Sequence, residues 1–121
     1  MNQYPEIKLG KVSIDENIYT DGDMVWMVPN LIEKSKNLPV FDLPIAAIHS
    51  GGHVWGDDAS PYAIAEHVKR AMDVDTSHPV IMCQRGFIMD GWHRVLRALI
   101  DGVPTIKAVR FEKTPQFDYK K

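Results

Sequence analysis

The sequence predicts a single α+β domain built on a small mixed sheet with packed helices. Short apolar runs typical of strands alternate with amphipathic helical segments, but without the regular rhythm of repeated strand–helix–strand units. The 121 residues suffice for one hydrophobic core and are too few for two. A hydrophobic content of 45% and a charged content of 25% are typical of a globular domain.

Residues 1–42 are predicted to form an N-terminal extension that packs on the same domain. In residues 6–14 the alternating apolar pattern of a strand slips by one position around Gly10, as it does at a β-bulge. Two more strand-like segments, 18–20 and 24–28, flank an Asp-Gly sequence that favours a tight turn. These two segments therefore predict a β-hairpin.

A short amphipathic helix is predicted directly after the hairpin. Pro29 suits the first helical position, and Leu31, Ile32 and Ser35 share one face of the helix. The preceding Val28 has no side-chain oxygen with which to cap the helix, so its exact start is poorly defined.

Residues 43–111 are predicted to form the main domain. Residues 41–48 are predicted to form its first strand, and Pro44 indicates either a sheet edge or the first residues of the strand, because proline donates no hydrogen bond. Residues 49–58 are too rich in glycine and polar groups for regular structure, and they also contain two histidines and a tryptophan. A loop of this kind on a rigid scaffold is expected to carry function.

A longer helix begins at Ser60 and Pro61, since serine caps a helix well and proline fits its first turn. Its apolar residues are spaced to form one stripe, which is expected to provide part of the core. This stripe consists of Ile64, Ala65, Val68 and Met72.

A strand pair follows, with residues 80–83 and 87–89 joined by a turn at 84–86. The only cysteine, Cys83, lies in the first of these strands after three apolar residues, and we expect it to be a buried small hydrophobe. A single cysteine also excludes an internal disulfide and fits a reducing compartment.

The second amphipathic helix is predicted to begin near His93 and to end at Gly102. Residues 105–111 form the last strand, and the polar residues 112–121 are expected to fray as a tail.

Charge and hydropathy exclude several classes of protein. The net charge of −2 and the pI near 6.2 argue against broad, sequence-independent DNA binding, which requires a basic face. No apolar run approaches the ~20 residues of a membrane span, and the first residues lack the pattern of a signal peptide. The expected location is therefore the cytoplasm.

The residues with the clearest chemical pattern are Asp90, Gly91, Trp92, His93 and Arg94. They predict the end of a strand, a glycine turn and the first turn of a helix. Backbone N–H groups at a helix start, with a cation beside them, are suited to bind phosphate.

This pattern resembles the ParB/sulfiredoxin superfamily over roughly residues 43–111. The resemblance rests on Pro-Val-Ile-Met at 79–82, Gly-Phe-Ile-Met-Asp-Gly at 86–91, and the His-Arg pair that opens a helix. The box at 90–94 looks closest to the Asp-Gly-His-His-Arg form of the ParB-like free-serine kinases. Trp92 replaces the sulfiredoxin cysteine, which argues against sulfinic-acid reduction. The segment after residue 111 is too short for the DNA-binding helix-turn-helix of the partitioning proteins, so partitioning is not expected.

The resemblance implies a nucleotide site with phosphates at Gly91 and the helix start. Arg94 supplies a planar fork for phosphate oxygens, and His93 donates to phosphate or shuttles a proton. Asp90 accepts a hydroxyl proton or helps to hold Mg²⁺. Trp92 either stacks on a base or simply packs.

His49, Ser50 and His53 either complete this phosphate site or belong to a loop without a role. The expected activity is transfer or hydrolysis of a phosphoryl group of ATP, ADP or CTP, with an unknown small molecule or protein as acceptor. Mg²⁺ and the nucleotide are both implied by the resemblance.

The alternative is a ParB-like module, or a nuclease, that binds nucleic acid or protein and has no kinase activity. Its support is a group of basic residues in the last third of the chain, and the acidic overall charge counts against it. A zinc site is disfavoured because the histidines and Cys83 form no compact set. The basic residues are Arg85, Arg94, Arg97, Lys107 and Arg110.

Overall fold

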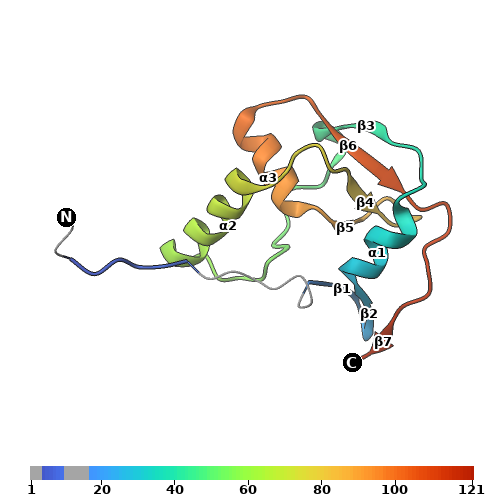
Figure 1. The fold of residues 1–121 in the computed structure, drawn as a ribbon, viewed down its shortest axis with the longest axis horizontal. Coiled ribbons are helices and arrows are strands. Elements are labelled where there is room, and N and C mark those ends of the chain that lie inside the picture. The colour runs from blue at the N-terminus through green and yellow to red at the C-terminus, as the bar shows by residue number, and fades with distance from the viewer. Residues whose placement is uncertain (1–3, 10–16) are drawn as a thin grey trace.

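A four-stranded mixed sheet lies at the centre of the computed structural model, which describes residues 4–9 and 17–121 (Figure 1). The strand order is β3-β6-β4-β5, with β4 parallel to β6 and the other neighbours antiparallel. The predicted α+β class with a small mixed sheet is therefore confirmed. The four strands are β3 (Phe41–Pro44), β4 (Val80–Met82), β5 (Ile88–Asp90) and β6 (Thr105–Arg110).

A separate three-stranded sheet contains the predicted hairpin. Asp21 pairs with Met24, which leaves Gly22 and Asp23 as a two-residue turn, and Gly22 has a φ of 63°. The left-handed backbone at this position favours glycine, as the Asp-Gly sequence indicated. The strands are β1 (Ile18–Asp21), β2 (Met24–Met27) and β7 (Tyr119–Lys120), in the order β1-β2-β7.

The three predicted helices are present. In α2 the Ser60 hydroxyl accepts a hydrogen bond from the Ala63 N–H at 3.2 Å, and α3 ends at Gly102, whose φ is 69°. Both ends agree with the capping residues in the sequence. The helices are α1 (Val28–Ser35), α2 (Pro61–Asp73) and α3 (Trp92–Asp101).

The central sheet is covered on both faces, and the side chains of β4 alternate between them. Val80 and Met82 face one core cluster, which contains Val95 and Ala98 of α3. The intervening Ile81 and the following Cys83 face a second cluster. Cys83 is 7% exposed, so its prediction as a buried residue is confirmed.

The second core cluster joins the central sheet to segments near the two ends of the chain. Trp26 of β2 and Leu31 of α1 are 6% and 1% exposed and pack with strand residues Ile81, Met89 and Val109. Burial of such side chains stabilises the fold by roughly 1.5–3 kcal/mol each. The hairpin and α1 thus supply the cover for this face of the sheet, in the lower right part of Figure 1.

The predicted strand 41–48 is too long, although its position at a sheet edge is confirmed. The strand stops at Pro44, and a short 3-10 helix, η2 (Ile45–Ala47), follows. The Ile45 N–H donates to the Pro104 carbonyl at 2.9 Å, and proline at 44 has no N–H with which to continue the ladder.

The apolar stripe of α2 does not enter the core as predicted. Ile64, Val68 and Met72 are 52%, 37% and 47% exposed, and only Ala71 of this helix is buried. The reason is that α2 packs on α3 rather than on the sheet, so a narrow line of contact replaces a broad buried face. Ile32 of α1 is likewise exposed, at 44%.

The C-terminal segment is not frayed, contrary to the prediction. Its strand β7 pairs with β2, and the Trp26 indole N–H donates to the Pro115 carbonyl at 2.8 Å. The Asp118 carboxylate accepts from the Met27 N–H at 2.7 Å and from the Asn30 side-chain amide at 2.9 Å. These contacts with residues far back in the sequence hold the segment in place.

The strand with a β-bulge predicted at 6–14 is not seen where the structure describes it. Residues 6–9 have no regular structure, and residues 10–14 lie outside the described residues. Tyr62 of α2 donates its hydroxyl to the Lys8 carbonyl at 3.2 Å, so this segment lies beside α2.

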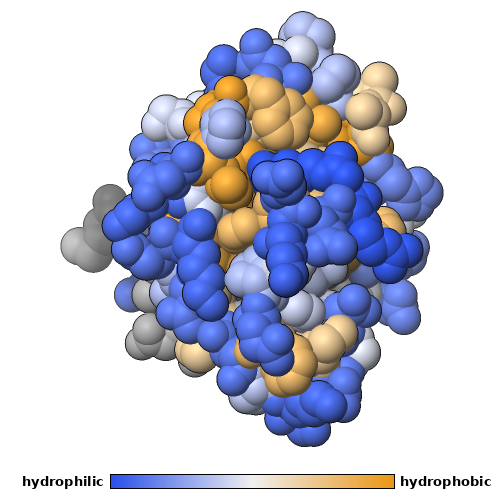
Figure 2. Space-filling view, turned by 90° about the vertical axis from the view of Figure 1, so that its right-hand side faces the viewer, coloured by the Kyte–Doolittle hydropathy of each residue, from blue (hydrophilic) through white to orange (hydrophobic). Residues whose placement is uncertain are grey.

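The face on the right-hand side of Figure 1 is mostly hydrophilic, with apolar side chains exposed in small patches between polar ones (Figure 2). Within residues 4–9 and 17–121, no helix is long and apolar enough to cross a membrane.

Candidate functional site

The start of α3 has the strand–glycine–helix geometry that the sequence predicts. β5 ends at Asp90, and Gly91 occupies the N-cap with a φ of 112°. The N–H groups of Arg94 and Val95 donate to the Gly91 carbonyl at 2.9 and 3.1 Å. The earlier N–H groups, of Trp92 and His93, have no acceptor within the described part of the chain and are available to an anion.

Gly91 is required by a close approach as well as by its backbone angle. A Cβ atom at this position would lie 2.6 Å from Cγ1 and 3.1 Å from Cα of Val80. Since the Val80 backbone belongs to the central sheet, it cannot move aside easily. The absence of a side chain at 91 therefore lets α3 begin directly against β4.

Arg94 and Asp90 form an ion pair at this helix start. Arg94 Nη1 donates to Asp90 Oδ2 at 3.5 Å, and Arg94 Nε donates to the Asp75 carbonyl at 3.3 Å. The side chains of Arg94 and Asp90 are 17% and 22% exposed, so this ion pair is largely shielded from water. Both contacts are long for hydrogen bonds that involve a charged group, which leaves room for a better partner.

His93 lies in a stack of three rings with Trp55 and His67. Trp55 lies 4.2 Å from His67 and 4.6 Å from His93, measured between ring centroids, with interplanar angles of 15° and 23°. His67 Nδ1 and His93 Nε2 are 3.0 Å apart, so one ring nitrogen donates and the other accepts. Trp55 belongs to the loop 49–58, which thereby lies against α2 and α3.

Both histidines are held neutral. Burial, and then the charges of His67, Arg70 and Arg94, lower the pKa of His93 from 6.5 to about 4. Burial and the charge of Arg70 lower the pKa of His67, against the opposing effect of Glu66 and Asp58. In this conformation His93 is therefore a neutral hydrogen-bonding group and a poor proton shuttle near pH 7.

A groove of about 290 Å³ lies beside this stack, between the loop 49–58, α2 and α3. Its lining is largely apolar, as is usual for small-molecule sites. Trp92 lines the groove and also packs against the first core cluster, so the two roles foreseen for it are compatible. The helices contribute Ile64, His67, Val68, Val95, Leu96 and Leu99.

The three loop residues predicted to complete the phosphate site, His49, Ser50 and His53, do not all lie at the groove. Ser50 and His53 line the groove, whereas His49 does not. His53 Nδ1 lies 3.2 Å from Asp57 Oδ1, and both side chains are well exposed. The structure thus brings Asp90, His93 and Arg94 together at the start of α3 and keeps His49 apart from the groove.

His67 and Trp55 were missed in the sequence. The sequence pattern marks Trp55 only as part of the loop 49–58, and it gives His67 no separate role on its helix. The position of His67 in the sequence gives a hint of its role, because the residue lies beside Val68 within the apolar stripe. In the structure both residues line the same groove. Only the packing of α2 on α3 brings it to His93.

The donor groups of the described residues form no preformed site for a resident metal ion. No cluster of three or more His, Cys, Asp or Glu side chains exists among residues 4–9 and 17–121. Asp90 is a single carboxylate already paired with Arg94, and the histidine pair has no further ligand beside it.

The basic residues of the last third do not form an open cationic face. Arg97 pairs with Asp101 at 2.8 Å and Lys107 with Asp42 at 2.6 Å, in addition to the pair of Arg94 with Asp90. The Arg110 guanidinium donates to the Gln84 carbonyl. These partners weaken the case for nucleic-acid binding.

Comparison with known proteins does not extend this description. No family model, no curated protein and no solved structure matches the chain.

Proposed function

We propose that this chain is a ParB/sulfiredoxin-like domain that binds a nucleotide and transfers or hydrolyses its phosphoryl group. The observation that carries the proposal is the start of α3, where open backbone N–H groups, Arg94 and a neutral histidine pair lie beside a largely apolar groove. The nucleotide is ATP, ADP or CTP, and the acceptor is water or a hydroxyl-bearing molecule.

The phosphates occupy the helix start in this proposal. The N–H groups of Trp92 and His93 point along the axis of α3 away from the helix, where the helix dipole favours negative charge. Gly91 positions these groups, since the absence of its side chain lets α3 begin directly against Val80.

Arg94 changes partners when the phosphate binds. Its contacts with Asp90 and Asp75 measure 3.5 and 3.3 Å, whereas a phosphate can accept two short bonds from the guanidinium fork. This exchange frees the Asp90 carboxylate beside the transferred group. The unbound arrangement therefore keeps both functional groups paired until the ligand arrives.

The base lies in the groove between α2, α3 and the loop 49–58. A planar ring suits this space because Trp92 and the apolar helix side chains offer flat and non-polar walls. Trp55, stacked on both histidines, closes the side of the groove near the phosphates.

The chemical step needs a base and a stabilised phosphoryl group. An oxygen–phosphorus bond forms from the acceptor hydroxyl while the bond to the nucleotide breaks, and the hydroxyl proton passes to Asp90. Arg94 and the helix start balance the charge on the phosphoryl oxygens, and neutral His93 donates a hydrogen bond to one of them. Magnesium accompanies the nucleotide phosphates in this proposal and is not held by the chain.

The test is a thermal unfolding screen with ATP, ADP and CTP, each with magnesium or with a chelator. We expect one nucleotide to raise Tm by about 10 °C at a hundredfold excess over its Kd. Arg94→Ala should abolish this gain. The matched control is Arg97→Ala, on the same helix but paired with Asp101, which should retain it.

For each variant, Tm with nucleotide is compared with Tm of the same variant without nucleotide. This is needed because the loss of Arg94 leaves Asp90 unpaired and lowers Tm even without ligand. If no nucleotide shifts Tm of the unmodified chain, the proposal is wrong. A gain that persists in Arg94→Ala would place the ligand elsewhere.

A further inference from the structure

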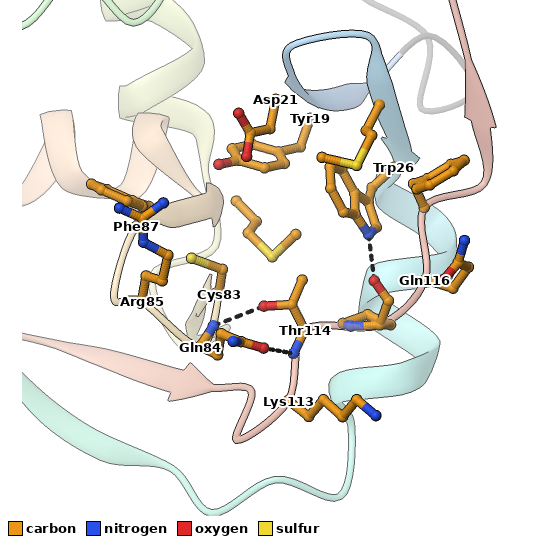
Figure 3. Close-up of a pocket in the computed structure, with 14 residues that line it drawn as sticks. Tyr19, Asp21, Trp26, Cys83, Gln84, Arg85, Phe87, Lys113, Thr114 and Gln116 are labelled. Atoms are coloured by element: carbon orange, nitrogen blue, oxygen red, sulfur yellow. Dashed lines mark hydrogen bonds between the residues drawn. The ribbon is translucent and has the colours of Figure 1, made fainter.

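A second and larger hollow lies on the opposite face of the central sheet, with a volume of about 550 Å³. Three segments far apart in the sequence form it: the hairpin β1–β2, the turn between β4 and β5, and residues 113–117 (Figure 3). Its size lies within the usual range for small-molecule sites. None of the residues proposed above for the nucleotide site lines it.

The floor and walls of this hollow are aromatic and sulfur-containing. Trp26, Cys83 and Met89 form the buried floor and belong to the second core cluster. Tyr19 and Phe117 flank Trp26, with ring centroids 5.6 and 6.3 Å from the indole. Flat rings and polarisable sulfur favour contact with another planar ring.

Hydrogen bonds hold the walls in place without a ligand. The Gln84 N–H donates to the Thr114 hydroxyl and the Thr114 N–H donates to the Gln84 side-chain oxygen, each at 2.9 Å. The Trp26 indole N–H donates to the Pro115 carbonyl at 2.8 Å. These bonds tie the C-terminal segment to the β4–β5 turn and to the floor, so the hollow is preformed.

The rim of the hollow carries an excess of positive charge. Arg85 and Lys113 line it, and neither has an ion-pair partner among the residues that the structure describes. Arg85 lies 5.2 Å above the Phe87 ring, which positions its guanidinium at the rim. The lining contains one acidic residue, Asp21.

From this arrangement we infer a binding site for a small planar aromatic molecule that bears one anionic group. The ring lies against Tyr19, Trp26 and Phe117, and the anionic group lies at the rim, where Arg85 on one side and Lys113 on another make the potential positive. The aromatic floor excludes a ligand that is charged throughout, and the cationic rim disfavours a neutral or cationic ligand.

Tyr19 contributes a polar group to the same space. Burial, with the nearby Cys83 and Asp21, raises the pKa of Tyr19 above its ordinary value, while Arg85 acts in the opposite direction. The phenol therefore stays protonated at neutral pH and can donate a hydrogen bond to the ligand.

The test uses three probes of equal shape: 2-naphthoate, neutral 2-naphthalenemethanol and cationic 2-naphthylmethylammonium. Binding is followed by titration with ¹H–¹⁵N spectra, in which the three tryptophan indole signals report separate places. We expect 2-naphthoate to bind best and to shift the signal of Trp26, assigned with Trp55→Phe and Trp92→Phe. The signals of Trp55 and Trp92 should stay in place.

Removal of the rim charges is the second arm. The double variant Arg85→Gln with Lys113→Gln should weaken 2-naphthoate roughly fivefold and leave the neutral probe unchanged. Lys36→Gln with Lys69→Gln removes the same charge next to the end of α1 and from α2, and should change the affinity for neither probe.

The inference would be overturned if 2-naphthoate did not bind. It would also be overturned if the probe shifted the indole signal of Trp55 or Trp92 in place of that of Trp26. Equal weakening by both double variants would mean that net charge, and not the rim, attracts the probe. These outcomes are independent of the nucleotide screen, because the two sites share no lining residue.

Discussion

The two sites that we propose, one on each face of the central sheet, differ in construction. On one face the start of α3 is made of consecutive residues, 90–94, in a strand–glycine–helix arrangement. On the other face the aromatic hollow combines Tyr19, Cys83 and Thr114, which are distant in the sequence. The first proposed site consists of consecutive residues that one close contact, Gly91 against Val80, holds on the sheet. The second is formed only because segments near both ends of the chain pack on the sheet.

The difference shows how each site is stabilised. The start of α3 depends on one steric requirement, the fit of Gly91 against Val80. The hollow depends on several separate contacts, among them the Gln84–Thr114 bonds and the pairing of β7 with β2. A single substitution should therefore damage the first proposed site severely and the second only slightly.

The largest expected effect is that of Gly91→Ala. The new Cβ would meet Val80 at 2.6 Å in a left-handed backbone, and we expect a loss of about 3 kcal/mol in the free energy of unfolding. Gly102→Ala is the matched control, since it has a φ of 69° but nothing within 4 Å, and should cost about 1 kcal/mol. Chemical denaturation measures both, and equal costs would show that the contact with Val80 is unimportant.

The next effect concerns the pH dependence of stability. Because the pKa of His93 is about 4 in the folded chain and near 6.5 when unfolded, the unfolded state binds the proton more readily. The contribution of neutral His93 to the free energy of unfolding is fully present above pH 6.5 and is lost as the pH falls toward 4. We expect a loss of roughly 2 kcal/mol after allowance for partial exposure.

His93→Gln should flatten this part of the curve, measured by denaturation at several pH values. His49→Gln, a change in an exposed histidine outside the stack, should leave the curve as it is. If both variants keep the same slope between pH 6.5 and 4, the histidine pair is not buried as described.

The smallest effect tests the hollow through the C-terminal segment. The Asp118 carboxylate accepts two hydrogen bonds at the start of α1, which has no cap from its own side chains. Asp118→Ala should cost about 1 kcal/mol and increase hydrogen exchange of the Lys121 N–H, which donates to the Asp23 carbonyl. Asp118→Asn, which keeps an oxygen acceptor, should cost less, and an unchanged exchange rate in Asp118→Ala would contradict this role.

The sequence predicted the local features of the fold well. The Asp-Gly turn, the Ser60-Pro61 helix start and the Gly102 helix end each depend on the backbone preferences of one or two residues. Most of the predictions that were wrong depended on distant partners, whereas the overlong strand 41–48 stops at Pro44 for a local reason. The apolar stripe with Ile64 and Val68 looked like core, but α2 packs on α3 and leaves it exposed.

The same division applies to the two sites. The strand–glycine–helix start at 90–94 could be predicted from the residues alone, because a glycine between a strand and an amphipathic helix suits a positive φ. The contact of His67 and Trp55 with His93, and the hollow between Tyr19, Cys83 and Thr114, come instead from the packing of distant segments. Such contacts arise when separate segments bury their apolar faces together, and the order of residues along the chain does not reveal which segments will meet.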